Sequence, residues 1–183
     1  GSLPVATFKA PSPIDTGLNF SCRVQGSGAK CWGNNSSGQI GNNSLATARK
    51  SVSVNNLSGV AAVVTGGQHA CGLLNSGAVK CWGKNTNGQL GNNSLTNAKT
   101  PVSVSGLSSA QSLSAGDSHT CVLMENGTVR CWGKGQGGRL GNGQTSDQKT
   151  SVQVTGIGGG SAKAVAVSAG DEHTCALLTT GAI

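Results

Sequence analysis

The sequence repeats itself with a period of about 50 residues, and this period limits the possible folds more than any other feature. The tripeptide Cys-Trp-Gly begins at Cys31, Cys81 and Cys131. A second phrase follows each tripeptide and reads GQIGNNS, GQLGNNS and GRLGNGQ in the three copies. A fixed period of this length is typical of solenoids and propellers, in which each repeat is one structural unit.

Each unit is composed of short strands rather than helices. The chain of 183 residues holds 30 glycines, and no window places apolar residues at the spacing of an amphipathic helix. Short alternating runs recur instead: SVSV, PVSV and SVQV, followed by VAAVV, AQSLSA and AVAVSA. Runs of this kind indicate strands, and about four of them per unit predict a four-stranded propeller blade. The expected fold class is therefore all-β, a β-propeller of about three and a half blades that forms a partial ring.

The period divides the chain into an N-terminal segment and a series of units. The segment covers residues 1–20 and is a candidate to complete a blade. The units are expected at 21–70, 71–120 and 121–174, with a partial unit at 175–183.

Each complete unit carries two cysteines at the spacing of a β-hairpin. Opposed residues in an antiparallel pair have position numbers with a constant sum, so a pair of Cys121 and Cys131 leaves a three-residue loop that ends in Gly127, as such loops prefer. The first pair is nine positions apart, which leaves a two-residue loop that begins with Gly26. Because spacing and turn residues change together, we predict three disulfides: Cys22–Cys31, Cys71–Cys81 and Cys121–Cys131.

Two other interpretations of these cysteines fit less well. Zinc sites favour closely spaced Cys-x2–4-Cys clusters, and buried reduced thiols would not require the matched turns. Disulfides indicate an oxidising compartment, so we expect an extracellular or cell-surface location. The sequence has no apolar stretch long enough to span a membrane and no signal peptide, so a secreted form is expected to have lost its signal before residue 1.

The seventh cysteine, Cys175, is expected to be unpaired. The spacing of the two preceding units places its partner ten residues on, at position 185, beyond Ile183. This break favours a fragment of a longer chain. The alternative is self-association, in which two or more copies complete the propeller or form a filament, and the segment from Leu3 to Phe20 of one copy completes the last blade of its neighbour.

The phrase GDSHTCVLMENGTVRCWGKGQGGRLGN, with its counterparts from Gly66 and Gly170, resembles the repeat of the regulator of chromosome condensation family. The match covers residues 20 to 183, and the cysteines resemble those of the secreted bacterial branch of the family. The resemblance implies a β-propeller, commonly of seven blades. The founding member of the family is a nuclear nucleotide-exchange factor for a small GTPase that also contacts chromatin. Its functional residues do not transfer, because the matched positions form the scaffold.

The histidines and tryptophans occupy repeated positions, and each set has a functional and a structural interpretation. In the functional interpretation, the histidines form a metal or acid–base site. In the structural interpretation, a repeated turn uses Asp to satisfy backbone amides and His to bond a neighbouring strand. The tryptophans form a sugar-binding platform or, alternatively, core rings between blades. We favour the structural role for both sets: His69, His119, His173, Trp32, Trp82 and Trp132.

Charge is the one property that points to a class of partner. The formal net charge is +7, and a ring of cations would attract acidic glycans or phosphate polymers. The structural alternative is solvated charge that keeps outer strand edges from pairing. With 3% aromatic residues, base stacking has little support, so nucleic acid is not the expected partner. The candidate anion-binding residues are Lys80, Arg130, Lys84 and Lys134, and a second set is expected in the connecting loops: Arg49, Lys50, Lys99 and Lys149.

No nucleophile elbow, phosphate loop or carboxylate pair is visible, so we expect a protein that is not an enzyme and needs no cofactor or metal. The leading interpretation is an extracellular binding or structural propeller that recognises a protein or glycan surface through its loops. The alternatives are an intracellular regulator that resembles a guanine-nucleotide-exchange factor and a secreted enzyme inhibitor.

Overall fold

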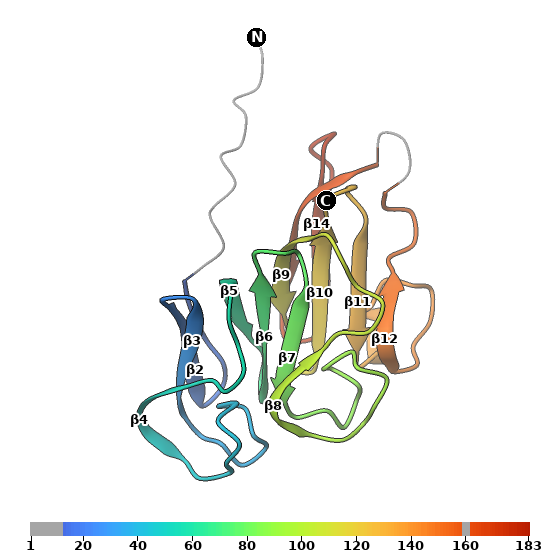
Figure 1. Cartoon of the computed structure of the whole chain (residues 1–183). Coiled ribbons are helices and arrows are strands. Elements are labelled where there is room, and N and C mark those ends of the chain that lie inside the picture. Colours follow the sequence, from blue (N-terminus) through green and yellow to red (C-terminus); the bar gives the residue numbers. More distant parts are fainter. Residues whose placement is uncertain (1–12, 159–161) are drawn as a thin grey trace.

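Four antiparallel sheets follow one another along the chain and form an arc of propeller blades (Figure 1). The computed structural model describes residues 13–158 and 162–183. Each of the first three sheets has four strands in sequential order, and the fourth has two. The predicted all-β partial propeller of about three and a half blades is confirmed.

The strands have similar lengths in every blade. Blade one contains β1 (Ile14–Thr16), β2 (Phe20–Gln25), β3 (Gly28–Gly33) and β4 (Ala48–Ser53). Blade two contains β5 (Val60–Thr65), β6 (His69–Leu74), β7 (Val79–Gly83) and β8 (Ala98–Ser103). Blade three contains β9 (Ala110–Ala115), β10 (His119–Met124), β11 (Val129–Gly133) and β12 (Gln148–Gln153), with a short 3-10 helix, η1 (Gln136–Gly138). The partial blade four consists of β13 (Ala164–Ala169) and β14 (Thr174–Leu178). Across the residues that the structure describes, no helix is both long and apolar enough to cross a membrane.

The first strand of blade one comes from the N-terminal segment. β1 pairs with β2 of the same chain, with Ile14 opposite Arg23. The stretch from Ile14 to Thr16 therefore contributes the first strand of blade one in its own chain. Residues 1–12 of the segment lie outside the described residues.

The hairpins between second and third strands have the predicted registers and turns. Cys22 lies opposite Cys31, and Cys121 lies opposite Cys131. The first hairpin turns at Gly26 with φ 60°, and the loop of the third ends in Gly127 with φ 82°. Glycine suits both places because a side chain disfavours this left-handed backbone.

The outer strands begin earlier than the alternating sequence pattern predicts. A bulge beside the Cys-Trp-Gly tripeptide lets Gly33 pair with Ala48, and the same shift recurs in blades two and three. The expectation that the second set of cations lies in connecting loops is wrong for this reason. These residues lie exposed on the outer strands β4, β8 and β12: Arg49, Lys50, Lys99 and Lys149.

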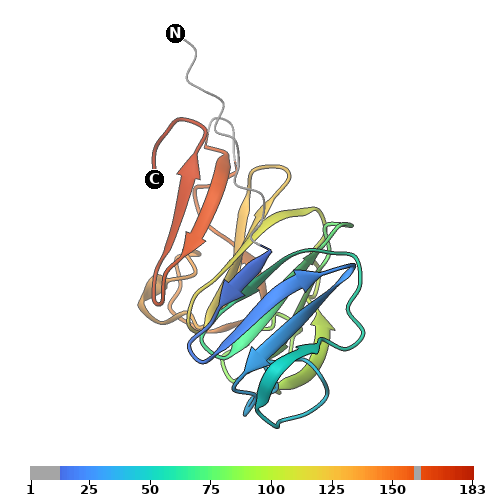
Figure 2. The same ribbon diagram turned by 90° about the vertical axis from the view of Figure 1, so that its left-hand side faces the viewer.

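Because the strands of each blade are antiparallel, the connections between them lie at two opposite ends of the strands. The connections 34–47, 84–97 and 134–147 join third to fourth strands at one end, which we call the loop end; they gather in the lower part of Figure 1. The hairpin turns lie at the opposite end, which we call the turn end. The inner strands β1, β5, β9 and β13 contact one another from blade to blade, and β13 and β14 form the last pair of the arc (Figure 2).

Candidate binding surface at the loop end

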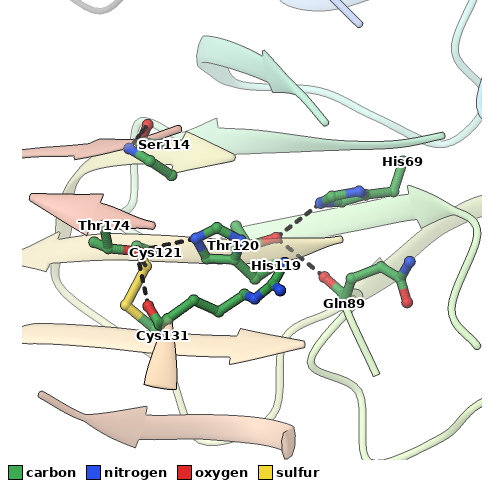
Figure 3. The surroundings of a disulfide bond; sticks show 10 residues. His69, Gln89, Ser114, His119, Thr120, Cys121, Cys131 and Thr174 are labelled. Atoms are coloured by element: carbon green, nitrogen blue, oxygen red, sulfur yellow. Dashed lines mark hydrogen bonds between the residues drawn. A yellow bond between two sulfur atoms is a disulfide. The ribbon is translucent and has the colours of Figure 1, made fainter. Parts of the chain in front are cut away.

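The repeated histidines join neighbouring blades. His69 Nε2 on β6 lies 2.9 Å from Thr120 Oγ1 on β10, and this hydroxyl donates to Gln89 O at 3.1 Å (Figure 3). Because the hydroxyl proton is directed at the carbonyl, the His69 Nε2–H group is the donor in the first bond. The threonine of one blade is thus held by a side chain and a backbone carbonyl of the blade before it.

The same bonds recur one blade further along, and apolar residues replace them one blade earlier. His119 Nε2 lies 2.9 Å from Thr174 Oγ1, which donates to Arg139 O at 3.0 Å. Phe20 stands at the histidine position of blade one, and Ala70 stands at the threonine position of blade two. Both are buried in one core cluster. At the junction of blades one and two, the apolar pair Phe20 and Ala70 therefore replaces both the histidine and the threonine.

Burial lowers the pKa of both junction histidines. The pKa of His69 falls from 6.5 to about 4, mainly because the ring is removed from water; the charge of His119 lowers it further, and Asp117 opposes the shift. Burial also lowers the pKa of His119 to about 4, with Arg139 as the next cause. Within the described residues, Nδ1 of each ring has no hydrogen-bond partner. Both rings are neutral at pH 7 and hold blades together.

Two of the three tryptophans fill the junctions between blades. Trp82 Nε1 donates to Gln39 O and Trp132 Nε1 donates to Gln89 O, each at 2.9 Å, and both rings are fully buried. Trp32 is only half-buried, and within the described residues no sheet packs against it as blade one packs against Trp82. At the other edge of the arc, His173 is exposed on the partial blade.

The disulfides close hairpins within single blades. They join the pairs that the sequence predicts: Cys22–Cys31, Cys71–Cys81 and Cys121–Cys131. The paired Cα atoms lie 4.0 to 4.1 Å apart, nearest to the short, non-hydrogen-bonded spacing of antiparallel strands. Cys175 on β14 is free and exposed. In the part of the chain that the structure describes, no group of three or more His, Cys, Asp or Glu side chains could hold a metal ion.

Carboxylates at the loop end bond to neighbouring protein groups. A hollow of about 360 Å³ opens there between the inner strands, and Asp15, Asp117 and Asp171 contribute to its lining. Asp15 Oδ2 accepts a hydrogen bond from Thr65 N at 2.8 Å, and Asp117 Oδ2 accepts one from Ser118 Oγ at 2.8 Å. The oxygens of Asp15 and Asp117 thus fix local backbone and side chains.

Hydrogen bonds hold the long loops of the loop end in a fixed shape. Asn35 is fully buried, and its Nδ2 donates to three oxygens of its own loop at 3.0 to 3.2 Å. Asn85 repeats this pattern in the second loop at 2.9 to 3.1 Å. In the third loop Gly135 takes the asparagine position, and its N–H donates to Asp147 Oδ1 at 3.0 Å. The loops are therefore preorganised.

The first two long loops expose a leucine at the same place. Leu45 is 55% exposed and Leu95 is 51% exposed. Each loop is also bonded to the outer strand of the next blade through a backbone N–H at 2.9 Å: Asn43 to Lys99 O and Asn93 to Lys149 O. Apolar loop residues are thereby set beside strands that carry exposed lysines.

The predicted anion-binding residues fall into two groups. Lys84 and Lys134 are half-buried at the base of the second and third long loops, at the loop end. Lys80 and Arg130 lie within the third strands instead, and Arg130 donates to Ser151 Oγ at 3.0 Å and to Ser151 O at 2.7 Å. The structure therefore brings Lys84 and Lys134 to the loop end but directs Arg130 toward the outer strand of its own blade.

The exposed leucines and the buried loop asparagines are not among the residues predicted from the sequence. A signal for the leucines exists, because the phrase Asn-Asn-Ser-Leu occurs at 42–45 and again at 92–95. A leucine that recurs in a polar loop, outside any alternating run, is a candidate for an exposed contact.

Two family models match the chain. The model described as "Regulator of chromosome condensation (RCC1) repeat" matches residues 76–123 and 126–177, and a second model with this description matches 60–89 and 110–139. The first model alone covers more than half of the chain. The search of the curated proteins found no match to this chain.

Several solved structures share the architecture over most of the chain. Human WBSCR16 has a TM-score of 0.80 at 20% identity, over 92% of this chain and 44% of its own. Prp20p from Saccharomyces cerevisiae has a TM-score of 0.79 at 18% identity, over 92% and 43%. The ectodomain of the Physcomitrella patens receptor kinase CR4 has a TM-score of 0.56 at 25% identity, over 93% and 36%. The chain spans less than half the length of each of these proteins.

Proposed function

Because the chain belongs to the regulator of chromosome condensation (RCC1) repeat family, we propose that it is a non-catalytic propeller that binds a protein surface through its loop end. The observation that carries this proposal is the pair of preorganised loops that expose Leu45 and Leu95. Rigid loops lose little conformational entropy on binding, and apolar contacts within a polar rim are typical of protein interfaces.

Structural neighbours support binding of proteins as the general activity. Prp20p from Saccharomyces cerevisiae binds Gsp1p and histones, and Kap60 binds the same yeast protein. An extracellular setting is supported by the three disulfides, since such bonds persist in oxidising compartments. The CR4 neighbour, an ectodomain of a receptor kinase, provides an extracellular example of the architecture. We therefore place the proposed function outside the cell.

The leucine proposal is tested by placing charge on the loops. The double variant Leu45→Glu and Leu95→Glu should reduce capture of a partner from an extract of the source's own cell surface by about tenfold or more, because each charge would be buried in the contact. The matched control adds the same charges to exposed turns of the same blades at the turn end, as Ser27→Glu and Ser76→Glu. Equal capture by both double variants would contradict the proposal.

A second candidate partner is an acidic glycan, which Lys84 and Lys134 at the base of the loops favour. If they bind an anion, the variant Lys84→Glu and Lys134→Glu should lower retention on a heparin-like matrix, and salt should weaken retention steeply. The control is Lys30→Glu and Lys80→Glu, which makes the same change of net charge within the third strands. Retention that responds equally to both pairs would reflect net charge alone and exclude a glycan site at the loop end.

A further inference from the structure

The hollow between the inner strands at the loop end, which we call the axial hollow, has the size of a binding site. Its volume of about 360 Å³ lies within the range usual for ligand pockets, about 300–1,000 Å³. Its walls come from the final residues of β1, β5, β9 and β13 and from the turns that follow them. Each of these strands has its hairpin partner in the described chain, so the hollow does not result from an unpaired sheet edge.

The charge of the axial hollow is opposite to that of the whole chain. The formal net charge is +7 and only six residues are acidic, yet three of the six line this hollow: Asp15, Asp117 and Asp171. No lysine, arginine or histidine belongs to its lining among the described residues. A lining of one sign in a concave surface attracts ligands of the opposite charge.

The three carboxylates are not placed to share one small ion. Among the residues described, no group of three or more acidic, histidine or cysteine side chains could hold a metal. A ligand that bonds to several of these carboxylates must therefore carry its donors apart from one another. A guanidinium group meets this requirement, because it presents five N–H donors around a rigid plane, whereas an ammonium group is a compact point charge.

Each carboxylate keeps an oxygen for a ligand. Asp15 and Asp117 use Oδ2 in the bonds described above, and within the described chain neither Oδ1 accepts a hydrogen bond. The exposed Asp171 side chain has no hydrogen bond or ion pair with the described residues. Gly67 makes room for Asp117, since a Cβ on this glycine would collide with Asp117 Oδ1. The carboxylate of blade three therefore extends over the turn of blade two.

A buried hydroxyl in the same wall lacks a partner. Thr65 lines the axial hollow and is 6% exposed, and its Oγ1 has no hydrogen-bond partner among the described residues. A buried polar atom without a partner is rare in a folded protein and calls for an explanation. Ala115 and Ala169 stand at the equivalent position in the next two blades, so the fold does not need a hydroxyl there. An N–H group of a ligand would supply the missing partner.

The rim of the axial hollow carries an apolar side chain. Leu18 occupies in blade one the repeat position that Asp117 and Asp171 occupy in blades three and four. It belongs to the lining and is 65% exposed. An arginine side chain combines an apolar stem with a charged head, so the leucine suits the stem and the carboxylates suit the head.

We infer that the axial hollow receives an arginine side chain of the protein partner. This inference rests on the proposed function, because the arginine belongs to the protein that binds at the loop end. The guanidinium donates to the carboxylates and to Thr65 Oγ1, and the stem packs on Leu18. Hydrogen bonds between charged groups are about twice as strong as those between neutral ones, and arginine is enriched among the residues that dominate protein interfaces.

The first test uses a probe that needs no partner, Nα-acetyl-arginine amide, and measures its binding to the intact chain by the NMR shifts of backbone amides in the turns at Gly67 and Asp117. We expect saturable binding that is about tenfold weaker for the citrulline analogue, which has the same shape and no charge. Asp171→Asn should weaken binding about threefold. The matched control, Glu125→Gln, removes the same charge from an exposed residue at the turn end and should not change binding. Equal binding of the two probes overturns the inference.

The threonine separates a role in binding from a role in the fold. Thr65→Val keeps the shape of the side chain and removes the hydroxyl that has no partner. It should weaken binding of the arginine probe by about threefold or more, and it should leave the midpoint of urea unfolding unchanged or higher, because a buried unpaired group is lost. Unchanged binding of the probe by this variant would show that the hydroxyl serves no ligand and would contradict the inference.

A further arm tests whether the arginine belongs to a protein. In capture from the cell-surface extract, a saturating concentration of the arginine probe should lower the amount of partner bound to the intact chain by about threefold or more, and the citrulline probe should not. Capture that resists the arginine probe would assign the hollow to a free cation and overturn the inference. The proposed function would still stand if Leu45→Glu and Leu95→Glu reduced capture, because these leucines lie outside the lining of the axial hollow.

Discussion

At the scale of residues, each junction between blades depends on a pair of side chains that changes as a unit. Two junctions use histidine with threonine, and one uses Phe20 with Ala70. The polar pair requires a neutral ring that donates through Nε2, and the apolar pair requires no particular protonation state. A mixed pair would leave a buried polar atom without a partner, at a cost of about 1–3 kcal/mol. The histidines therefore make the junctions sensitive to pH.

We expect the free energy of unfolding to decrease as the pH falls from about 6.5 toward 4. Histidine in the unfolded chain takes up a proton near pH 6.5, whereas the pKa of His69 and His119 in the folded chain is about 4. The unfolded state thus binds more protons in this window, and the stabilisation that is complete above pH 6.5 is lost by up to about 1.4 kcal/mol per pH unit for each histidine. Urea denaturation at a series of pH values measures the slope.

The chain offers a matched control for this prediction. The double variant His69→Phe and Thr120→Ala rebuilds the second junction with the residue types of Phe20 and Ala70. It should fold and should lose about half of the pH dependence, because one of the two buried histidines is gone. A slope equal to that of the natural sequence would show that other groups cause the pH dependence.

At the scale of elements, each of the three complete blades is reinforced internally, by a disulfide across its hairpin and by hydrogen bonds within its long loop. Asn85→Ala should lower the free energy of unfolding by about 1–3 kcal/mol, because three oxygens of the loop lose the donor that the buried Asn85 side chain provides. It should also raise amide hydrogen exchange in residues 84–97. The control, Asn75→Ala, removes an exposed amide at the turn end and should leave both quantities nearly unchanged.

The hairpin disulfides lead to a prediction about the mass and the cysteine links of the oxidised protein. The oxidised protein should be six hydrogens lighter than the reduced protein, two for each of three bonds, and peptide mapping should link cysteines only within each hairpin. Reduction should cost less than about 3 kcal/mol per bond, since loops of this length restrict the unfolded chain only modestly. A link between blades, or one that includes Cys175, would contradict the hairpin pairing.

Elements with a local cause were predictable from the sequence, and elements that depend on pairing with distant residues were not. The turns at Gly26 and Gly127 follow from cysteine spacing and glycine position. By contrast, β1 has no alternating pattern and exists because Ile14 pairs with Arg23. The early start of β4 depends on a bulge in its partner strand. The loop leucines were not predicted because their exposure is set by the anchoring of each loop on the next blade.

At the scale of the whole molecule, the described blades follow one another in an arc, and their inner strands contact each other from each blade to the next. Side-chain hydrogen bonds and buried rings join adjacent blades. Stability in such an array is approximately a sum of blade terms and junction terms. The described chain holds three disulfides, and each lies within one blade.

Because no disulfide crosses a junction, the chain has a simple response to mechanical force. Pulled from its two ends, it should lengthen in steps as blades detach, and each disulfide shields from tension the segment between its cysteines, which are 9 or 10 positions apart. A single-molecule trace should therefore show steps of blades one to three that are shorter by roughly 30 Å under oxidising than under reducing conditions. The oxidised hairpins act as stops that limit how far each blade can be drawn out, so a protein anchored at a surface and loaded by its partner would yield in short, bounded extensions.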